Sequence, residues 1–233
     1  MPEPVSKNGW RTHRFDEMAI NVNDRIDDPS KADVEYYVGL EHLDPESLTI
    51  RRWGSPSDVE ATKLRFRAGD IIFGRRRVYQ RKLGVAHFDG ICSAHAMVLR
   101  AKPSVALPAF LPFFMQSDLF MERAKEISVG SLSPTINWKT LAKDEFALPP
   151  LDEQHRIVEL AQGAHRATES LRDVLETELV AELSLFNELV ARGSADLASI
   201  HRFLDGASAD SHLAVSGGAG SDRLAAEPGD RVS

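Results

Sequence analysis

Residues 129–160 read VGSLSPTINWKTLAKDEFALPPLDEQHRIVEL and join two different kinds of sequence. They contain a turn rich in Gly, Ser and Pro, a short apolar run, the pair Pro149 and Pro150, and the start of a helical pattern. Asp152 can cap that helix, and Glu153 in the first turn complements the helix dipole. The stretch therefore predicts a compact domain that is joined to a long helix by a short connection.

The helical pattern continues from Asp152 to Arg192, with no proline and a single glycine, before Gly193 offers a stop. A helix of about 40 residues extends about 60 Å, which is too long for a domain of this size to cover. The apolar residues recur every three or four positions and predict coiled-coil pairing with a second helix. The predicted dimerisation residues are Leu171, Leu175, Leu179, Leu183, Phe186 and Val190.

The part of the chain before the connection is rich in candidate strands. Short runs of apolar, aromatic and β-branched residues, bounded by Gly, Pro or Asp, are typical of strands. The expected strands are 34–40, 48–53, 64–67, 71–74, 85–88 and 96–100. Residues 106–127 have helical spacing and are predicted to form one or two helices packed on a sheet.

The predicted fold class is α/β, with a mixed-sheet domain followed by a long helical spacer. The domain is expected over residues 1–150 and the helix over residues 151–193. The tail, 194–233, is predicted to be largely disordered, because from Asp205 onward it has no apolar period.

The charge is distributed unevenly along the chain. Residues 51–143 carry 16 basic and 7 acidic side chains, a net charge of +9, although the whole chain has a net charge of −7. A basic middle between acidic flanks is expected if one face meets a polyanion. The alternative is that these charge blocks are solvated surface.

The sequence shows little sign of catalytic chemistry. Gly217–Gly220 has no strand before it, the eight histidines form no ligand motif, and the grouped carboxylates lack nuclease spacing. Cys92, the only cysteine, is more typical of packing than of a nucleophile. Neither catalytic nor metal-binding residues are predicted. No signal-peptide or membrane-span pattern is found, and a cytoplasmic location without membrane contact is predicted.

A binding surface is predicted instead, starting from the loop 74–84, which holds five cations. Arginine and lysine neutralise phosphates, while arginine and glutamine can also read base edges. Two further turns, 93–95 and 130–139, add hydroxyl, imidazole, amide and ammonium groups. The alternative is that a solvated hairpin and ordinary turns explain these residues. The predicted DNA-binding residues are Arg75, Arg76, Arg77, Tyr79, Gln80, Arg81, Lys82, Ser93, His95, Ser133, Asn137 and Lys139.

Three segments, 69–75, 88–93 and 130–154, together resemble the specificity subunit of type I restriction-modification systems. The last contains Gly-x-x-x-Pro-x-Ile followed by Leu-Pro-Pro-Leu-x-Glu-Gln. The resemblance implies a target recognition domain for one half of a bipartite DNA site, on a helical spacer. It also implies a non-catalytic subunit without cofactors of its own. S-adenosylmethionine, ATP and Mg are then expected on partner subunits, and no base contact can be carried over residue by residue.

The resemblance departs from the family in one respect, because typical members have two recognition domains and two helical regions. This chain has one of each and resembles a half-size subunit. The implied partners are double-stranded DNA, a modification methyltransferase subunit, a restriction subunit, and a second copy or another half subunit. The alternatives are a stand-alone DNA-binding regulator or inactive remnant, a coiled-coil interaction scaffold, and a nuclease.

Overall fold

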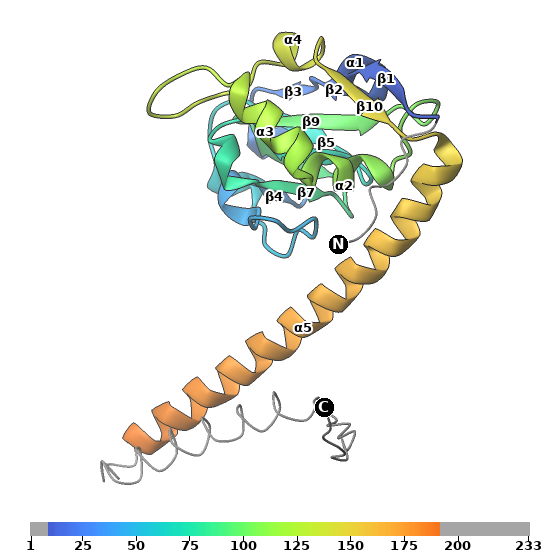
Figure 1. Ribbon diagram of the computed structural model, residues 1–233. Coiled ribbons are helices and arrows are strands. Elements are labelled where there is room, and N and C mark those ends of the chain that lie inside the picture. Colours follow the sequence, from blue (N-terminus) through green and yellow to red (C-terminus); the bar gives the residue numbers. More distant parts are fainter. Residues whose placement is uncertain (1–8, 192–233) are drawn as a thin grey trace, which may run out of the picture. The chain divides into compact units, whose positions relative to one another are not determined.

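The computed structural model describes residues 9–191, except for the side chains of Leu189 and Ala191. The chain divides into two compact units between Ala167 and Thr168, and one continuous helix, α5 (Leu151–Ala191), runs through the division. The predicted disorder of the tail, 194–233, concerns residues outside this described range. The first unit contains all the strands of the described chain and is coloured blue to yellow in Figure 1.

The first unit is built on two four-stranded sheets and a two-stranded ribbon. The first sheet is antiparallel and has the order β2 (Ala19–Val22), β9 (Ala96–Ala101), β6 (Ile71–Gly74), β7 (Leu83–Val85). The second sheet has the order β3 (Arg25–Ile26), β5 (Lys63–Phe66), β8 (Gly90–Ser93), β4 (Tyr37–Val38). Its β4 and β8 are parallel, and its other pairs are antiparallel. The ribbon pairs β1 (Arg11–Arg14) with β10 (Glu145–Leu148).

The helical elements of this unit are short. The α-helices before α5 are α1 (Phe15–Met18), α2 (Phe110–Gln116), α3 (Asp118–Glu126) and α4 (Trp138–Leu141). The 3-10 helices are η1 (Pro29–Lys31), η2 (Leu40–His42), η3 (Pro56–Asp58) and η4 (Val78–Gln80). In Figure 1, α2 and α3 cross in front of the sheet that contains β9 and β7.

The central strands of the first sheet are buried on both faces. Ile71 and Phe73 of β6 face the core beneath the helices, which includes Phe120 of α3. Ile72, between them, faces the core shared with Phe66 of the second sheet. A strand covered on both faces has no polar alternation, which is why this run is continuously apolar. The mixed α/β fold class is therefore confirmed.

Several predicted elements match the structure closely. The strands expected at 64–67, 71–74 and 96–100 are β5, β6 and β9. The segment 106–127 contains two helices, because Ser117 ends α2 and its hydroxyl accepts a hydrogen bond from Phe120 N of α3. The long helix begins at Leu151, directly after Pro150.

Other strand predictions were wrong in extent or in kind. Residues 34–40 contain only the two-residue β4, because the chain turns into η2 at Leu40. The segment 48–53 is not a strand: it makes one bridge, between Thr49 and Val85. The neighbouring β7 has only three residues, so it is too short to form a continuous ladder with this segment. The strand expected at 85–88 ends at Val85, where Ala86 N instead bonds to Asp70 O.

The segment 69–75 begins in an exposed turn between β5 and β6 that is held by the buried side chain of Asp70. Gly69 has a positive φ of 89°, which side-chain-bearing residues rarely adopt. Asp70 is 1% exposed, and its carboxylate accepts hydrogen bonds from Arg100 at 2.7 and 2.8 Å and from Arg67 N at 2.9 Å. The hydrogen bond with Asp70 raises the pKa of Arg100. This part of the pattern therefore stabilises the fold.

The connection at 148–154 is held by the side chain of Gln154, which is 1% exposed. Its amide nitrogen donates to Val105 O at 2.9 Å and Pro149 O at 3.0 Å. Its amide oxygen accepts from Leu107 N at 2.9 Å. The first turns of α5 therefore belong to the core of the first unit, and the compact unit extends past the predicted boundary at residue 150 to Ala167.

Candidate nucleic-acid interface

The basic loop, residues 75–82, connects β6 to β7 and is fixed by a segment more than fifty residues away. Arg77 N donates to Pro134 O at 2.8 Å, and Ile136 N donates to Arg75 O at 2.9 Å. The Arg76 Nε donates to the Ser133 hydroxyl at 2.8 Å. These hydrogen bonds bring together the basic loop and the segment 130–139, which the sequence predicted as parts of one DNA-binding surface.

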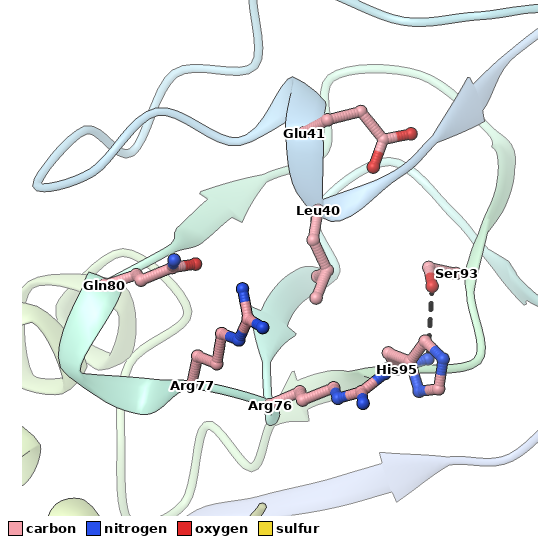
Figure 2. A pocket seen from close by; sticks show the side chains of 7 residues that line it. All are labelled: Leu40, Glu41, Arg76, Arg77, Gln80, Ser93 and His95. Atoms are coloured by element: carbon pink, nitrogen blue, oxygen red, sulfur yellow. Dashed lines mark hydrogen bonds between the residues drawn. The ribbon is translucent and has the colours of Figure 1, made fainter. Parts of the chain in front are cut away.

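The loop lines a hollow of about 310 Å³ at one end of the second sheet. Because β4 and β8 are parallel, η2 after β4 and the turn 93–95 after β8 meet at the same edge. The basic loop supplies the opposite wall, as Figure 2 shows. The lining residues are Leu40, Glu41, Arg76, Arg77, Gln80, Ser93 and His95.

Arg77 is the most available cation of this hollow. Its residue is exposed, and the part of the chain that the structure describes gives its guanidinium no hydrogen bond or ion pair. In Figure 2 its side chain points across the hollow toward Leu40. Tyr79, two residues further along the loop, is 53% exposed. These side chains are free to meet an external anion or a base edge.

His95 adds a neutral polar group to the same hollow. Partial burial, followed by the positive charges of Arg76 and Arg75, lowers the pKa of His95 from its ordinary value of 6.5. A lowered pKa keeps the imidazole neutral at pH 7, so one ring nitrogen can donate a hydrogen bond and the other can accept one. Its backbone N–H donates to the Ser93 hydroxyl at 3.2 Å, which orders the turn.

Other predicted DNA-binding residues do not line the hollow. Lys82 Nζ donates to Leu40 O at 2.7 Å, and Arg75 is half-buried with its Nε enclosed. Asn137 caps α4 by accepting a hydrogen bond from Lys139 N at 3.1 Å, and both residues are exposed. The sequence pattern grouped residues that share a loop, whereas only some of them share a surface.

Arg81 serves the fold rather than the hollow. Its guanidinium pairs with Asp118 at 2.7 Å and Glu46 at 3.3 Å, and it donates to Gln116 O. Its backbone has a positive φ of 52°. The basic loop and the start of α3 are therefore tied together by a side chain that sequence alone assigns to DNA.

We expect Arg81→Ala to lower the free energy of unfolding by about 1–2 kcal/mol, because hydrogen bonds to a partly buried charged group are lost. Chemical denaturation checks this value. The salt dependence of DNA binding should stay unchanged, because this charge already has partners in the protein. A loss of salt dependence with unchanged stability would contradict the assignment.

The residues that sequence reasoning missed are Leu40 and Glu41. They belong to the acidic first part of the chain, where no cluster of cations marks a DNA-binding surface. Only the parallel pairing of β4 with β8 brings them to the basic loop. No local sequence pattern indicates that Leu40 and Glu41 lie beside the basic loop.

The described residues offer no support for thiol or metal chemistry. Cys92 is fully buried in the core between the two sheets, and this burial raises the pKa of its thiol. A raised pKa suppresses the thiolate that nucleophilic attack requires. Within residues 9–191, no three His, Cys, Asp or Glu side chains gather closely enough to hold a metal ion. The same part of the chain has no helix long and apolar enough to span a membrane.

The second unit carries the predicted dimerisation stripe on α5. Its six residues, Leu171 to Val190 at the predicted spacing, are 49–66% exposed. A row of exposed large apolar side chains on a polar helix is typical of a helix that pairs with a partner.

The chain matches proteins of known class. Residues 59–172 match the family model described as Type I restriction modification DNA specificity domain. The Type I restriction enzyme EcoDI specificity subunit of Escherichia coli is 26% identical over 193 residues, which are 81% of this chain and 42% of that relative.

Solved structures share the fold. The HsdS subunit from Thermoanaerobacter tengcongensis has 24% identity and a TM-score of 0.58, over 72% of this chain and 44% of its own. A chain from a study titled "Structural basis underlying complex assembly and conformational transition of the type I R-M system" has 25% identity and a TM-score of 0.58. That match covers 82% of this chain and 50% of the other.

These matches make the chain similar to the DNA-specificity proteins of restriction-modification systems. More particularly, it resembles the type I specificity subunits, and its residues 59–172 match the model of their DNA specificity domain. The resemblance predicted from the sequence is thus confirmed. The chain spans half or less of the length of the relatives it matches.

Proposed function

We propose that this chain is a non-catalytic recognition subunit that reads one half of a bipartite DNA site and docks modification methyltransferase subunits. The hollow at the basic loop carries the proposal. It combines exposed guanidinium groups for phosphates or guanine with the Gln80 amide and a neutral imidazole for base edges. Methyl transfer from S-adenosylmethionine and restriction with ATP and Mg are assigned to partner subunits.

The exposed stripe on α5 supports a second element of the proposal. We assign it to pairing with a second copy or another half subunit. A symmetric pair would present two recognition domains, and an inverted DNA repeat with a fixed gap is the target that matches this symmetry.

The test begins with selection of bound sequences from a randomised duplex library by the full chain. On the selected duplex, the double variant Arg76→Ala, Arg77→Ala is expected to bind about 10- to 100-fold more weakly, because two charge-assisted contacts are lost. The slope of log affinity against log salt should fall by about 1 for each of these two arginines that contacts a phosphate rather than a base. Fluorescence anisotropy across a salt series measures both quantities.

The matched control is Arg25→Ala, Lys31→Ala, which removes the same charge from exposed residues outside the hollow. It should leave the affinity within about twofold. Equal losses of DNA affinity in both double variants would mean that overall charge, and not the hollow, accounts for binding. DNA binding without capture of a methyltransferase subunit would favour a stand-alone regulator. An absence of DNA binding would favour a coiled-coil scaffold.

A further inference from the structure

A carboxylate lies in the wall of this cationic hollow. Glu41 of η2 is exposed and lines the hollow together with Arg76 and Arg77. Within residues 9–191 the structure gives Glu41 no ion pair with either arginine. A negative charge on a phosphate-binding surface lowers affinity for DNA, because it repels the backbone. A surface built for phosphates alone would gain from its removal.

The position of this carboxylate depends on the residue two places before it. A Cβ atom added to Gly39 would overlap the carboxylate of Glu41, so the bare Cα of Gly39 leaves room for the carboxylate. The φ of Gly39 is −83°, which any residue can adopt, so the backbone does not require glycine here. Figure 2 shows Glu41 extending from η2 above Leu40 at the rim of the hollow.

The charge of Glu41 also acts on Tyr37 of the neighbouring β4. The pKa of Tyr37 is raised to about 12, first by burial and then by the negative charge of Glu41. The carboxylate is therefore part of the local field at this edge of the sheet. Because Glu41 is one of the lining residues, a base edge that enters the hollow would meet it.

Base edges differ in what they offer to a carboxylate, which can only accept hydrogen bonds. In the major groove, cytosine presents the N4 amino donor, whereas guanine and thymine present acceptors. Adenine presents its N6 donor next to the N7 acceptor, which repels a carboxylate. Arginine has the complementary preference, because it donates to both O6 and N7 of guanine. A neighbouring glutamate and arginine therefore match the two bases of a C·G pair.

We propose that Glu41 is a specificity-determining residue that accepts a hydrogen bond from the N4 amino group of a cytosine in the target, and that Arg77 contacts the paired guanine. This inference rests on the proposed function and names one base pair that the hollow reads. It turns an unfavourable charge into a source of discrimination: Glu41 weakens binding to every sequence, and the correct base pair offsets that loss.

The experiment compares the wild-type chain with Glu41→Ala by selection from a randomised duplex library, followed by affinity measurements on selected and mixed-sequence duplexes. The wild-type selection should contain a C·G pair at a fixed position. Glu41→Ala should lose the preference for that pair by about 5- to 100-fold. At the same time it should bind the mixed-sequence duplex more tightly than the wild type, because a repulsive charge is gone. A merely structural role for Glu41 would lower both affinities.

Two further variants sharpen the result. Gly39→Ala keeps the carboxylate of Glu41 but displaces it. This variant should therefore show a weaker preference for the same C·G pair. Glu35→Ala removes an equal charge from an exposed residue outside the hollow, and it should leave the selected sequence unchanged.

The outcomes separate the two proposals. A wild-type chain that selects no sequence overturns the proposed function and this inference together. A wild-type chain that selects a site, with a Glu41→Ala variant that keeps the identical site and preference, overturns this inference alone.

Discussion

Simultaneous replacement of Leu175, Leu179 and Leu183 by aspartate is expected to convert the chain to a monomer. These side chains are 54–64% exposed on α5, and pairing would bury them. Each buried leucine contributes about 1.5–3 kcal/mol, so three in each of two helices contribute on the order of 10 kcal/mol. A loss of that size removes association at micromolar concentrations. Sedimentation equilibrium measures the change.

A control with the same added charge lies on the opposite side of the helix. Thr177→Asp, Ala181→Asp and Ser184→Asp change exposed residues about half a turn away from the stripe. This triple variant should keep the association of the wild type. If both triple variants dissociate equally, charge repulsion explains the result and the stripe is not the interface.

Truncation is a poorer test of pairing unless the cut respects the compact unit. A chain ending at Pro150 loses Gln154 and Val158, both buried in the first unit, so a failure to associate would reflect unfolding. A chain ending at Ala167 keeps these residues and removes the stripe. It should therefore remain folded and be monomeric.

Gln154→Ala is expected to lower the free energy of unfolding of the first unit by about 3–6 kcal/mol. The substitution leaves Val105 O, Pro149 O and Leu107 N without their partner, the Gln154 side chain, which is itself 1% exposed. An unsatisfied buried group costs about 1–3 kcal/mol, and the groups of Val105 and Leu107, which are only partly buried, belong to the lower part of that range. Denaturant unfolding followed by tryptophan fluorescence measures the change.

The matched control is Gln162→Ala, which makes the same substitution at an exposed position of the same helix. It should change the stability by less than about 0.5 kcal/mol. An equal effect at both positions would assign the loss to helix propensity rather than to the connection. A negligible effect of Gln154→Ala would mean that water replaces the three hydrogen bonds.

Elements that their own residues specify were predicted correctly from the sequence, whereas elements that depend on contacts distant in the sequence were not. The strand at 71–74 was predictable, because Ile71, Ile72 and Phe73 are buried on both faces and must all be apolar. The strand β1 was not, because Arg11–Arg14 has no apolar pattern and exists through pairing with β10 at the far end of the domain. The run 48–53 has strand-like residues, but β7 offers it only one bridge.

The candidate site divides in the same way. The sequence by itself determined that a basic loop follows a buried strand, that a long helix follows Pro150, and that the three motif segments resemble type I specificity subunits. These features are local, because composition and the spacing of apolar residues specify them. Only the tertiary structure decided which charges face outward: Arg81 and Lys82 are paired inside the fold, while Arg77 is left available. It also brought Glu41 beside the basic loop, because strand pairing joins residues that no local pattern connects.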